Sequence, residues 1–155
     1  MQNLTPVKFL IVDDDAVDIM AIQRTMKKLK LANPVLVARN GIEALEILRG
    51  EADREKIMPP FIVTLDLNMP RMGGQEFLEH LREDEALRSV VVFVWSTSDA
   101  KSDVDASYER NVAGYIVKEQ GQETFKRALS MLEEYSQVVV LPNHSQQFMQ
   151  AARPN

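Results

Sequence analysis

The chain has 155 residues, of which 45% are hydrophobic, and this length and composition fit a single globular domain with a full-sized core. The formal net charge of −5 argues against a nucleic-acid surface, and the absence of cysteine excludes disulfides and thiolate metal sites. Because the sequence shows neither a signal peptide nor an apolar run of about 20 residues, we expect a soluble, cytoplasmic protein without a membrane or nucleic-acid partner.

Short apolar runs rich in β-branched and aromatic residues alternate along the chain with stretches of helical periodicity. The runs that predict strands are Val7–Val12, Val35–Ala38, Phe61–Leu65, Val90–Trp95 and Gly114–Val117. The stretches that predict helices are Ala16–Leu31, Gly41–Leu48, Gly74–Leu81, Lys101–Arg110 and the region around Phe125–Leu132. Nearly continuous apolar strands are typical of a sheet covered on both faces, and their alternation with helices favours parallel pairing. The pattern therefore predicts an α/β domain with a five-stranded parallel sheet between two helical layers.

Two segments lie outside this alternation. The charged stretch EADREKIMPP (Glu51–Pro60) ends in two prolines and predicts an exposed loop before the third strand. The stretch Ser136–Asn155 follows the last expected helix and contains the apolar run VVVLP (Val138–Pro142). We therefore expect one folded domain over residues 5–136 and a C-terminal tail over residues 137–155 that serves for dimerisation or packs on the domain.

Polar side chains follow four of the predicted strands at the point where each strand ends. They are Asp13, Asp14 and Asp15 after the first strand, Asp66 after the third, Ser96 and Thr97 after the fourth, and Lys118 after the fifth. The carboxyl ends of strands in an open parallel sheet meet at one edge, where ligands bind. Singly, each residue has a plain structural explanation; Asp15, for example, is a good helix cap. Their convergence from four strands is what predicts a functional site.

This set of side chains suits phosphoryl transfer. Clustered carboxylates need a compensating charge, and hard oxygen ligands suit Mg²⁺, which takes one or two carboxylates and keeps several waters. A carboxylate is also a nucleophile that forms an acyl phosphate when a phosphoryl donor is supplied. We therefore expect the aspartates after the first strand to hold Mg²⁺ and Asp66 to be the nucleophile. Lys118 and Ser96 are expected to bind the phosphoryl oxygens.

The same residues stand within a set of spaced motifs. The set consists of the acidic pair Asp13 and Asp14, Asp66 within LDLNMPRMGG, the hydroxyl residue Ser96, the aromatic Tyr115, and Lys118. With these motifs, the sequence over Thr5–Tyr135 resembles the receiver domain of two-component response regulators. The resemblance implies a flavodoxin-like (βα)5 three-layer sandwich with strands in the order 2-1-3-4-5. It also implies a phosphoacceptor that can catalyse its own phosphorylation and dephosphorylation, and not an enzyme.

The resemblance implies a role for each of these residues. Asp66 would accept a phosphoryl group from a sensor histidine kinase or phosphotransfer protein. Asp14 and Asp66 would bind Mg²⁺ directly, Asp13 would bind it through a water molecule, and the backbone carbonyl of Asn68 would add another oxygen ligand. Once Asp66 is phosphorylated, Ser96 and Lys118 would bind the phosphoryl oxygens, and the movement of Ser96 would let Tyr115 turn inward as a switch. We expect the signal to pass on through partner binding.

Several stretches are also similar to the small stand-alone regulators that are paired with bacterial phytochromes. They are the EADREKIMPP loop, DLNMPRMGG, SYERNVAGYIVK and VVVLP. This similarity implies a bacterial protein whose kinase is a bacteriophytochrome, and a homodimer formed through VVVLP and the face beside Tyr115. An intramolecular strand or a packed tail explains VVVLP equally well.

Two positions depart from the family pattern. Glu119 follows Lys118 where the family has a proline after a cis peptide bond. A non-proline cis bond costs about 3–4 kcal/mol, so we expect a trans bond here and a less well placed lysine. Trp95 is a bulky residue immediately before Ser96, and we expect it to pack in the core.

Two other functions stay open on the residues alone. A phosphatase of the haloacid-dehalogenase type also uses a strand-end aspartate and Mg²⁺, but it needs a second aspartate where this chain has Asn68. It also needs a cap domain, for which there is little room. A pseudo-receiver would keep the fold as an interaction module without phosphorylation. Glu119 favours this module, whereas the complete set of acidic, hydroxyl and lysine residues argues against it. We expect a phosphorylatable receiver.

Overall fold

The computed structural model describes residues 5–119 and 122–142. Its strands are β1 (Lys8–Val12), β2 (Val35–Ala38), β3 (Phe61–Leu65), β4 (Val92–Ser96) and β5 (Gly114–Val117). Its helices are α1 (Ala16–Lys28), α2 (Gly41–Arg49), α3 (Gly74–Glu83), α4 (Lys101–Glu109) and α5 (Gln122–Val138). Every strand and helix that the sequence predicts is therefore present. None of the helices in the described part of the chain is long and apolar enough to cross a membrane.

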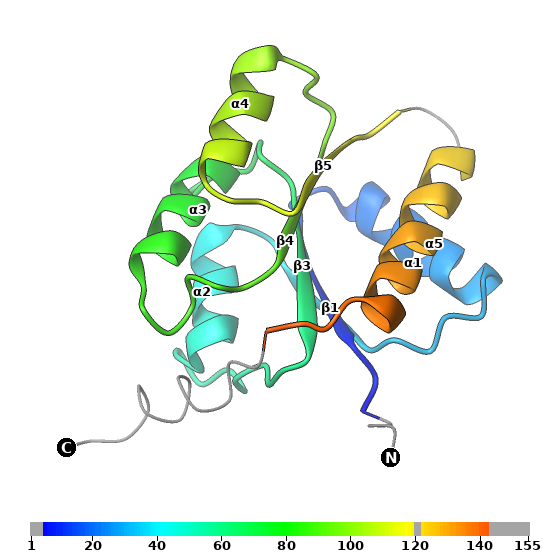
Figure 1. Ribbon diagram of the computed structural model, residues 1–155, viewed down its shortest axis with the longest axis horizontal. Helices are drawn as coiled ribbons and strands as arrows, with labels where there is room; N and C mark the ends of the chain where they lie inside the picture. The colour runs from blue at the N-terminus through cyan, green and yellow to red at the C-terminus, as the bar shows by residue number, and fades with distance from the viewer. Residues whose placement is uncertain (1–4, 120–121, 143–155) are drawn as a thin grey trace.

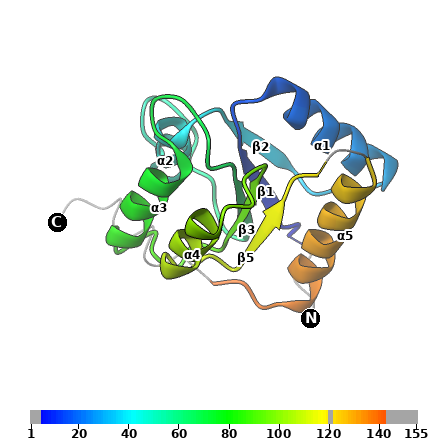
Figure 2. The ribbon, with the colours of Figure 1, turned by 90° about the horizontal axis from the view of Figure 1, so that it is seen from above.

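The five strands form one parallel sheet in the order β2-β1-β3-β4-β5 (Figure 1). Figure 2 shows α1 and α5 side by side on one face of this sheet, with α2, α3 and α4 on the other face. The expected flavodoxin-like sandwich of three layers is confirmed. The strand order reverses between β1 and β3, and ligands of such sheets bind at the carboxyl ends of the strands next to this reversal.

Successive residues of the central strands point to opposite faces of the sheet, and both faces are buried. Leu10 and Val12 of β1 belong to the cluster on the side of α2 and α3, whereas Phe9 and Ile11 belong to the cluster on the side of α1 and α5. Burial on both faces explains why the strands appear in the sequence as continuous apolar runs. Trp95 is buried in the cluster of α1 and α5, which confirms its expected place in the core.

The connection Glu51–Pro60 has no helix or strand, as predicted. One of its side chains is an exception to the expected exposure, because Ile57 is buried in the cluster of α2 and α3. The backbone N–H of Ile57 donates a hydrogen bond of 3.1 Å to the carbonyl of Ile47 on α2. The loop is therefore anchored at its centre. Within it the peptide bond Pro59–Pro60 is cis.

The apolar run Val138–Pro142 does not form a strand. Helix α5 continues to Val138, beyond the expected end of the domain at residue 136, and residues 139–142 follow without regular structure. Leu141 packs against the cluster of α1 and α5, while Val138 and Val140 are exposed. The expected intramolecular strand is therefore not formed over Val138–Pro142, the contact of Leu141 agrees with a packed tail, and the role of the tail stays a prediction. Residues 143–155 of the expected tail lie outside the described residues.

Candidate functional site

The structure brings the polar residues at the strand ends together at one edge of the sheet. Asp13 follows β1, Asp66 follows β3, Ser96 ends β4 and Lys118 follows β5. The Nζ atom of Lys118 lies 2.7 Å from Oδ2 of Asp13 and 3.7 Å from Oδ2 of Asp66. Lys118 thus shares one site with residues 105 and 52 positions earlier in the sequence, as the ends of the strands predict.

Three aspartates form an acidic cluster at this edge. One carboxylate oxygen of each of Asp13, Asp14 and Asp66 lies within 4.8 Å of the others. Asp13 and Asp66 are buried, whereas Asp14 is exposed. Buried carboxylates so close together need a compensating charge, and their hard oxygen atoms suit a divalent cation. The donor set therefore fits the expected metal site.

Backbone hydrogen bonds fix the two buried carboxylates of the cluster. Oδ1 of Asp13 accepts a bond of 2.9 Å from the N–H of Asp15, and Asp15 in turn caps α1 by accepting from Val17, as predicted. Oδ1 of Asp66 accepts a longer bond of 3.3 Å from the N–H of Asn68. These bonds leave Oδ2 of both aspartates facing Lys118.

The loop after β3 folds back closely on Asp66. The N–H of Gly74 donates to the carbonyl of Leu67 at 3.0 Å. A Cβ atom at Gly74 would lie 2.7 Å from the carbonyl oxygen of Asp66, closer than real side chains allow. The second glycine of the motif MPRMGG is therefore required by the path of the backbone beside the acidic cluster.

Burial governs the electrostatics of the site. It raises the pKa of Asp66 to about 6, an effect that the ammonium of Lys118 opposes and the charge of Asp13 reinforces. Burial likewise raises the pKa of Asp13, although the bond to Lys118 works against it. For Lys118, burial disfavours the charged form, but the surrounding carboxylates outweigh burial and the pKa lies above its usual value. The ion pairs therefore keep the lysine charged.

Ser96 and Tyr115 both contact the loop between β4 and α4. The side chain of Ser96 is fully buried, and its Oγ accepts a bond of 3.2 Å from the N–H of Ser98. The hydroxyl of Tyr115 donates to the carbonyl of Ser98 at 2.7 Å. The neighbouring Thr97 is exposed. The two residues expected to form a switch are therefore linked through one loop residue.

Lys118 reaches the site although glutamate follows it. The cis peptide bond among the described residues is Pro59–Pro60, so Lys118–Glu119 is trans, as expected. The backbone N–H of Lys118 donates to the carbonyl of Ser96 at 2.7 Å, which ties the residue to the end of β4. Its side chain is only 5% exposed, and Glu119 is exposed. The lysine therefore reaches the acidic cluster with a trans bond, and its less favourable placement relative to the family stays a prediction.

One residue of the site was absent from the sequence-based prediction. Oδ2 of Asp18, in the first turn of α1, lies 2.9 Å from Nζ of Lys118 and accepts a hydrogen bond from it. Asp18 stands three residues after the N-cap Asp15, and the sequence holds no pattern that connects this position with Lys118.

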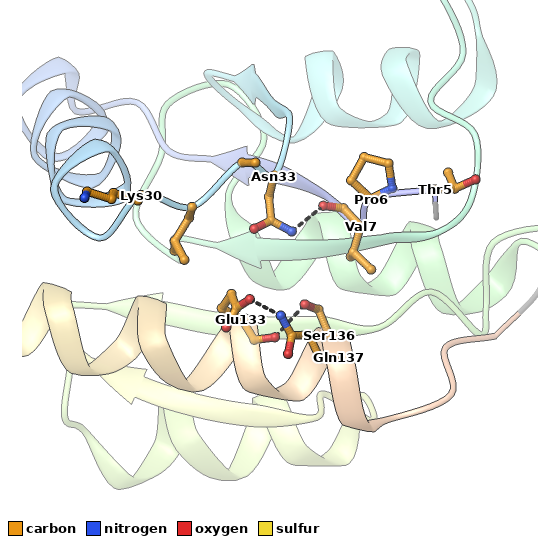
Figure 3. Close-up of a pocket in the computed structure, with 10 residues that line it drawn as sticks. Thr5, Pro6, Val7, Lys30, Asn33, Glu133, Ser136 and Gln137 are labelled. Carbon is orange, nitrogen blue, oxygen red and sulfur yellow. Dashed lines mark hydrogen bonds between the residues drawn. The ribbon is translucent and has the colours of Figure 1, made fainter. Parts of the chain in front are cut away.

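A separate cavity of about 730 Å³ lies at the opposite edge of the sheet, between the start of β1 and the ends of α1 and α5 (Figure 3). Several of its polar groups bond to one another or to nearby backbone. Asn33 donates to the carbonyl of Val7 at 2.8 Å, and Ser136 donates to the carbonyl of Glu133 at 2.6 Å. The cavity shares no residue with the acidic cluster, so the cluster is the candidate site.

A model of the response regulator receiver domain matches residues 9–130 of this chain. The chain belongs to this family. The response regulator Rcp1 of Synechocystis sp. is 29% identical over 138 residues, which cover 88% of this chain and 94% of Rcp1. The resemblance that the motifs indicate is thus confirmed at the level of the family.

Solved structures of receiver-domain proteins agree with this assignment. The phosphorylated cyanobacterial phytochrome response regulator RcpA has a TM-score of 0.81 and 30% identity, covering 90% of this chain and all of that one. The bacteriophytochrome response regulator RtBRR has a TM-score of 0.71 and 32% identity, covering 96% and 91% of the two chains. The Mn²⁺-bound form of Rcp1 has a TM-score of 0.78 and 29% identity, covering 88% and 99%. Receiver domains bind a divalent metal at such an acidic pocket.

Proposed function

We propose that this chain is a stand-alone response regulator that accepts a phosphoryl group on Asp66 and signals through a conformational change. The observation that carries the proposal is the meeting of Asp66 with Asp13, Asp14 and Lys118 at one edge of the sheet. Asp66 supplies the nucleophile, the neighbouring carboxylates hold a cation, and Lys118 supplies a positive charge. Phosphoryl transfer depends on this kind of positioning and charge neutralisation.

The transfer is a displacement at phosphorus. A carboxylate oxygen of Asp66 forms the new P–O bond while the P–N bond of a phosphohistidine breaks, and the electron pair of that bond stays on the imidazole nitrogen. Only the ionised carboxylate is a nucleophile. With a pKa of about 6, most of Asp66 is ionised at neutral pH. Lys118 and Ser96 bind the oxygens of the transferred group.

Mg²⁺ fits the donor set beside Asp66. The expected ligands are Asp13, Asp14, Asp66 and the backbone carbonyl of Asn68. The first three offer hard oxygen atoms at one place, and Mg²⁺ takes one or two carboxylates while keeping several waters. When bound, this ion supplies positive charge that offsets the charges of the carboxylates and the phosphoryl oxygens.

The conformational response starts at Ser96. When its hydroxyl binds a phosphoryl oxygen, the bond that Ser96 accepts from the N–H of Ser98 is weakened. Tyr115 is bonded to the carbonyl of the same Ser98, so a movement of this residue lets the ring of Tyr115 turn. The surface of α4 and β5 then changes for a partner. This is a local change in charge that biases a two-state element.

The phosphoryl donor in this proposal is a sensor histidine kinase or a phosphotransfer protein in the cytoplasm. The similarity to regulators named for phytochromes supports a bacteriophytochrome as the kinase. A homodimer through the face beside Tyr115 and the run Val138–Pro142 is part of the proposal, supported by the exposure of Val138 and Val140. In this proposal the chain acts as a phosphoacceptor and not as an enzyme.

Intact-mass measurement after incubation with Mg²⁺ and acetyl phosphate tests the proposal. We expect a gain of one phosphoryl group in the wild-type chain, and no gain in Asp66→Asn or in the presence of a chelator. A folded wild-type chain that binds Mg²⁺ but gains no mass, even with a phosphorylated histidine protein as donor, would contradict the proposal. The chain would then be a pseudo-receiver that keeps the fold as an interaction module.

A further inference from the structure

The ammonium group of Lys118 is shared unequally among three carboxylates. Its Nζ atom lies 2.7 Å from Asp13, 2.9 Å from Asp18 and 3.7 Å from Asp66. The first two contacts are charge-assisted hydrogen bonds, whereas the third is longer than a hydrogen bond. Lys118 is therefore hydrogen-bonded to Asp13 and Asp18, near the start of α1, and makes no hydrogen bond to Asp66.

Asp18 differs from the other two carboxylates in its surroundings. It lies in the first turn of α1, where the helix dipole favours a negative charge, and its side chain is 24% exposed. It does not belong to the three aspartates whose oxygens converge on the candidate cation site. Asp18 can therefore keep its hydrogen bond to Lys118 when Asp13, Asp14 and Asp66 bind a cation.

We propose that Asp18 is a positioning residue for Lys118. Asp18 holds the ammonium of Lys118 away from Asp66, and it remains the hydrogen-bond partner of Lys118 when Asp13 binds a cation. This inference rests on the proposed function, in which Lys118 binds the phosphoryl oxygens on Asp66. To reach those oxygens, Lys118 has to loosen its bond to Asp18. The strength of the bond between Asp18 and Lys118 thereby determines how readily the lysine binds the phosphoryl oxygens on Asp66.

The arrangement around Asp13 gives Asp18 its second role. Both oxygens of Asp13 are in use, because Oδ1 accepts from the N–H of Asp15 and Oδ2 accepts from Lys118. A cation beside Oδ2 of Asp13 would compete with the ammonium of Lys118 for that oxygen, because the two positive charges repel each other. A buried ammonium without a partner is costly, and Asp18 removes this cost by keeping its bond to the lysine.

Phosphorylation rates at saturating Mg²⁺, followed by intact mass with acetyl phosphate, test the first role. Asp18→Asn is expected to be about 3- to 10-fold faster than the wild-type chain, because a neutral amide competes for the ammonium less strongly than a carboxylate. Asp18→Glu keeps the charge and is expected to return to the wild-type rate. Glu76→Gln removes a negative charge from the first turn of another helix, α3, where Glu76 is exposed, and is expected to leave the rate unchanged. A rate of Asp18→Asn equal to or below that of Glu76→Gln would overturn the proposal.

Calorimetric titration with Mg²⁺ tests the pairing without any phosphoryl donor. Asp18→Asn is expected to raise the Kd for Mg²⁺, and to raise it about 3-fold more when Lys118 is present than in a Lys118→Met background. Equal factors in the two backgrounds overturn the proposal, and so does a wild-type chain that binds no Mg²⁺. A chain that shows the coupling but gains no phosphoryl group supports the role of Asp18 while contradicting the proposed function.

Discussion

The hydroxyl of Tyr115 on β5 donates a hydrogen bond of 2.7 Å to the backbone carbonyl of Ser98, in the loop that precedes α4. The side chain of Ser98 also holds the start of α4, because its hydroxyl donates to Asp103 at 2.5 Å. On its other side, the N–H of Ser98 donates to the buried hydroxyl of Ser96. One loop residue therefore connects the edge of the acidic cluster, β5 and α4.

The substitution Tyr115→Phe removes one of these three connections and keeps the ring. We expect the free energy of unfolding to fall by about 0.5–1.5 kcal/mol, the usual contribution of a single hydrogen bond. Urea denaturation gives this value. Tyr108→Phe is the matched control, because Tyr108 lies half-exposed on α4 and its loss of a hydroxyl should have almost no effect. Equal losses in the two variants would show that the bond to Ser98 contributes nothing.

A methyl group at Gly74 is expected to disturb the acidic cluster through the backbone. The added Cβ would lie 2.7 Å from the carbonyl oxygen of Asp66 and 2.8 Å from Cα of Leu67, so the loop must shift. We expect Gly74→Ala to lower the free energy of unfolding by about 1–3 kcal/mol and to weaken Mg²⁺ binding. Gly73→Ala is the control, because its nearest contact is 3.3 Å away. A Gly73→Ala variant that loses as much in both measurements would refute this explanation.

The sequence predicts the fold because the local patterns and the tertiary packing agree. The strands are covered on both faces, so they appear as continuous apolar runs, and their polar ends converge because parallel strands share a direction. Asp66 and Lys118 were predicted to meet for this reason, although 52 residues separate them in the chain. The cap at Asp15 was predictable from residue type alone.

Contacts between polar side chains of distant elements leave no periodic signal in the sequence. Helix α4 has a weak apolar pattern because its buried residue is Ser107, which accepts a hydrogen bond of 3.0 Å from Gln75 on α3. Arg110 strengthens this contact by pairing with Glu79 at 2.7 Å. The role of Asp18 was missed for the same reason, since helical periodicity does not show which polar side chain of the first turn reaches Lys118.

Arg82 on α3 is expected to be a main support of the loops at the far end of the molecule. Its guanidinium group donates bonds of 2.7 to 3.0 Å to the backbone carbonyls of Arg88, Val90, Arg110 and Asn111. Arg82→Met leaves these carbonyls without their donor, and we expect a loss of about 2–4 kcal/mol in urea denaturation. Arg88→Met changes an exposed side chain, keeps the backbone carbonyl, and should stay within about 0.5 kcal/mol of the wild-type chain. Similar losses in both variants would argue against a supporting role for Arg82.

The buried carboxylate of Asp66 is expected to make the metal-free protein less stable as the pH rises. Burial raises its pKa to about 6, above the ordinary value of 3.8. Between about pH 4 and pH 6 the folded chain therefore keeps a proton that the unfolded chain has released, so this contribution to stability is present at low pH and is lost as the pH rises through 6.

The substitution Asp66→Asn cannot ionise and should escape this loss. In the presence of a chelator we expect the variant to be about 1–3 kcal/mol more stable than the wild-type chain at pH 7.5, and close to it at pH 4. Saturating Mg²⁺ should narrow the difference at pH 7.5, because the ion binds the folded wild-type chain more tightly than the variant. Urea denaturation at the two pH values measures these differences. A wild-type chain that is the more stable of the two at pH 7.5 without metal would mean that Lys118 compensates the ionised Asp66 fully, and that the burial of this carboxylate costs the folded protein nothing.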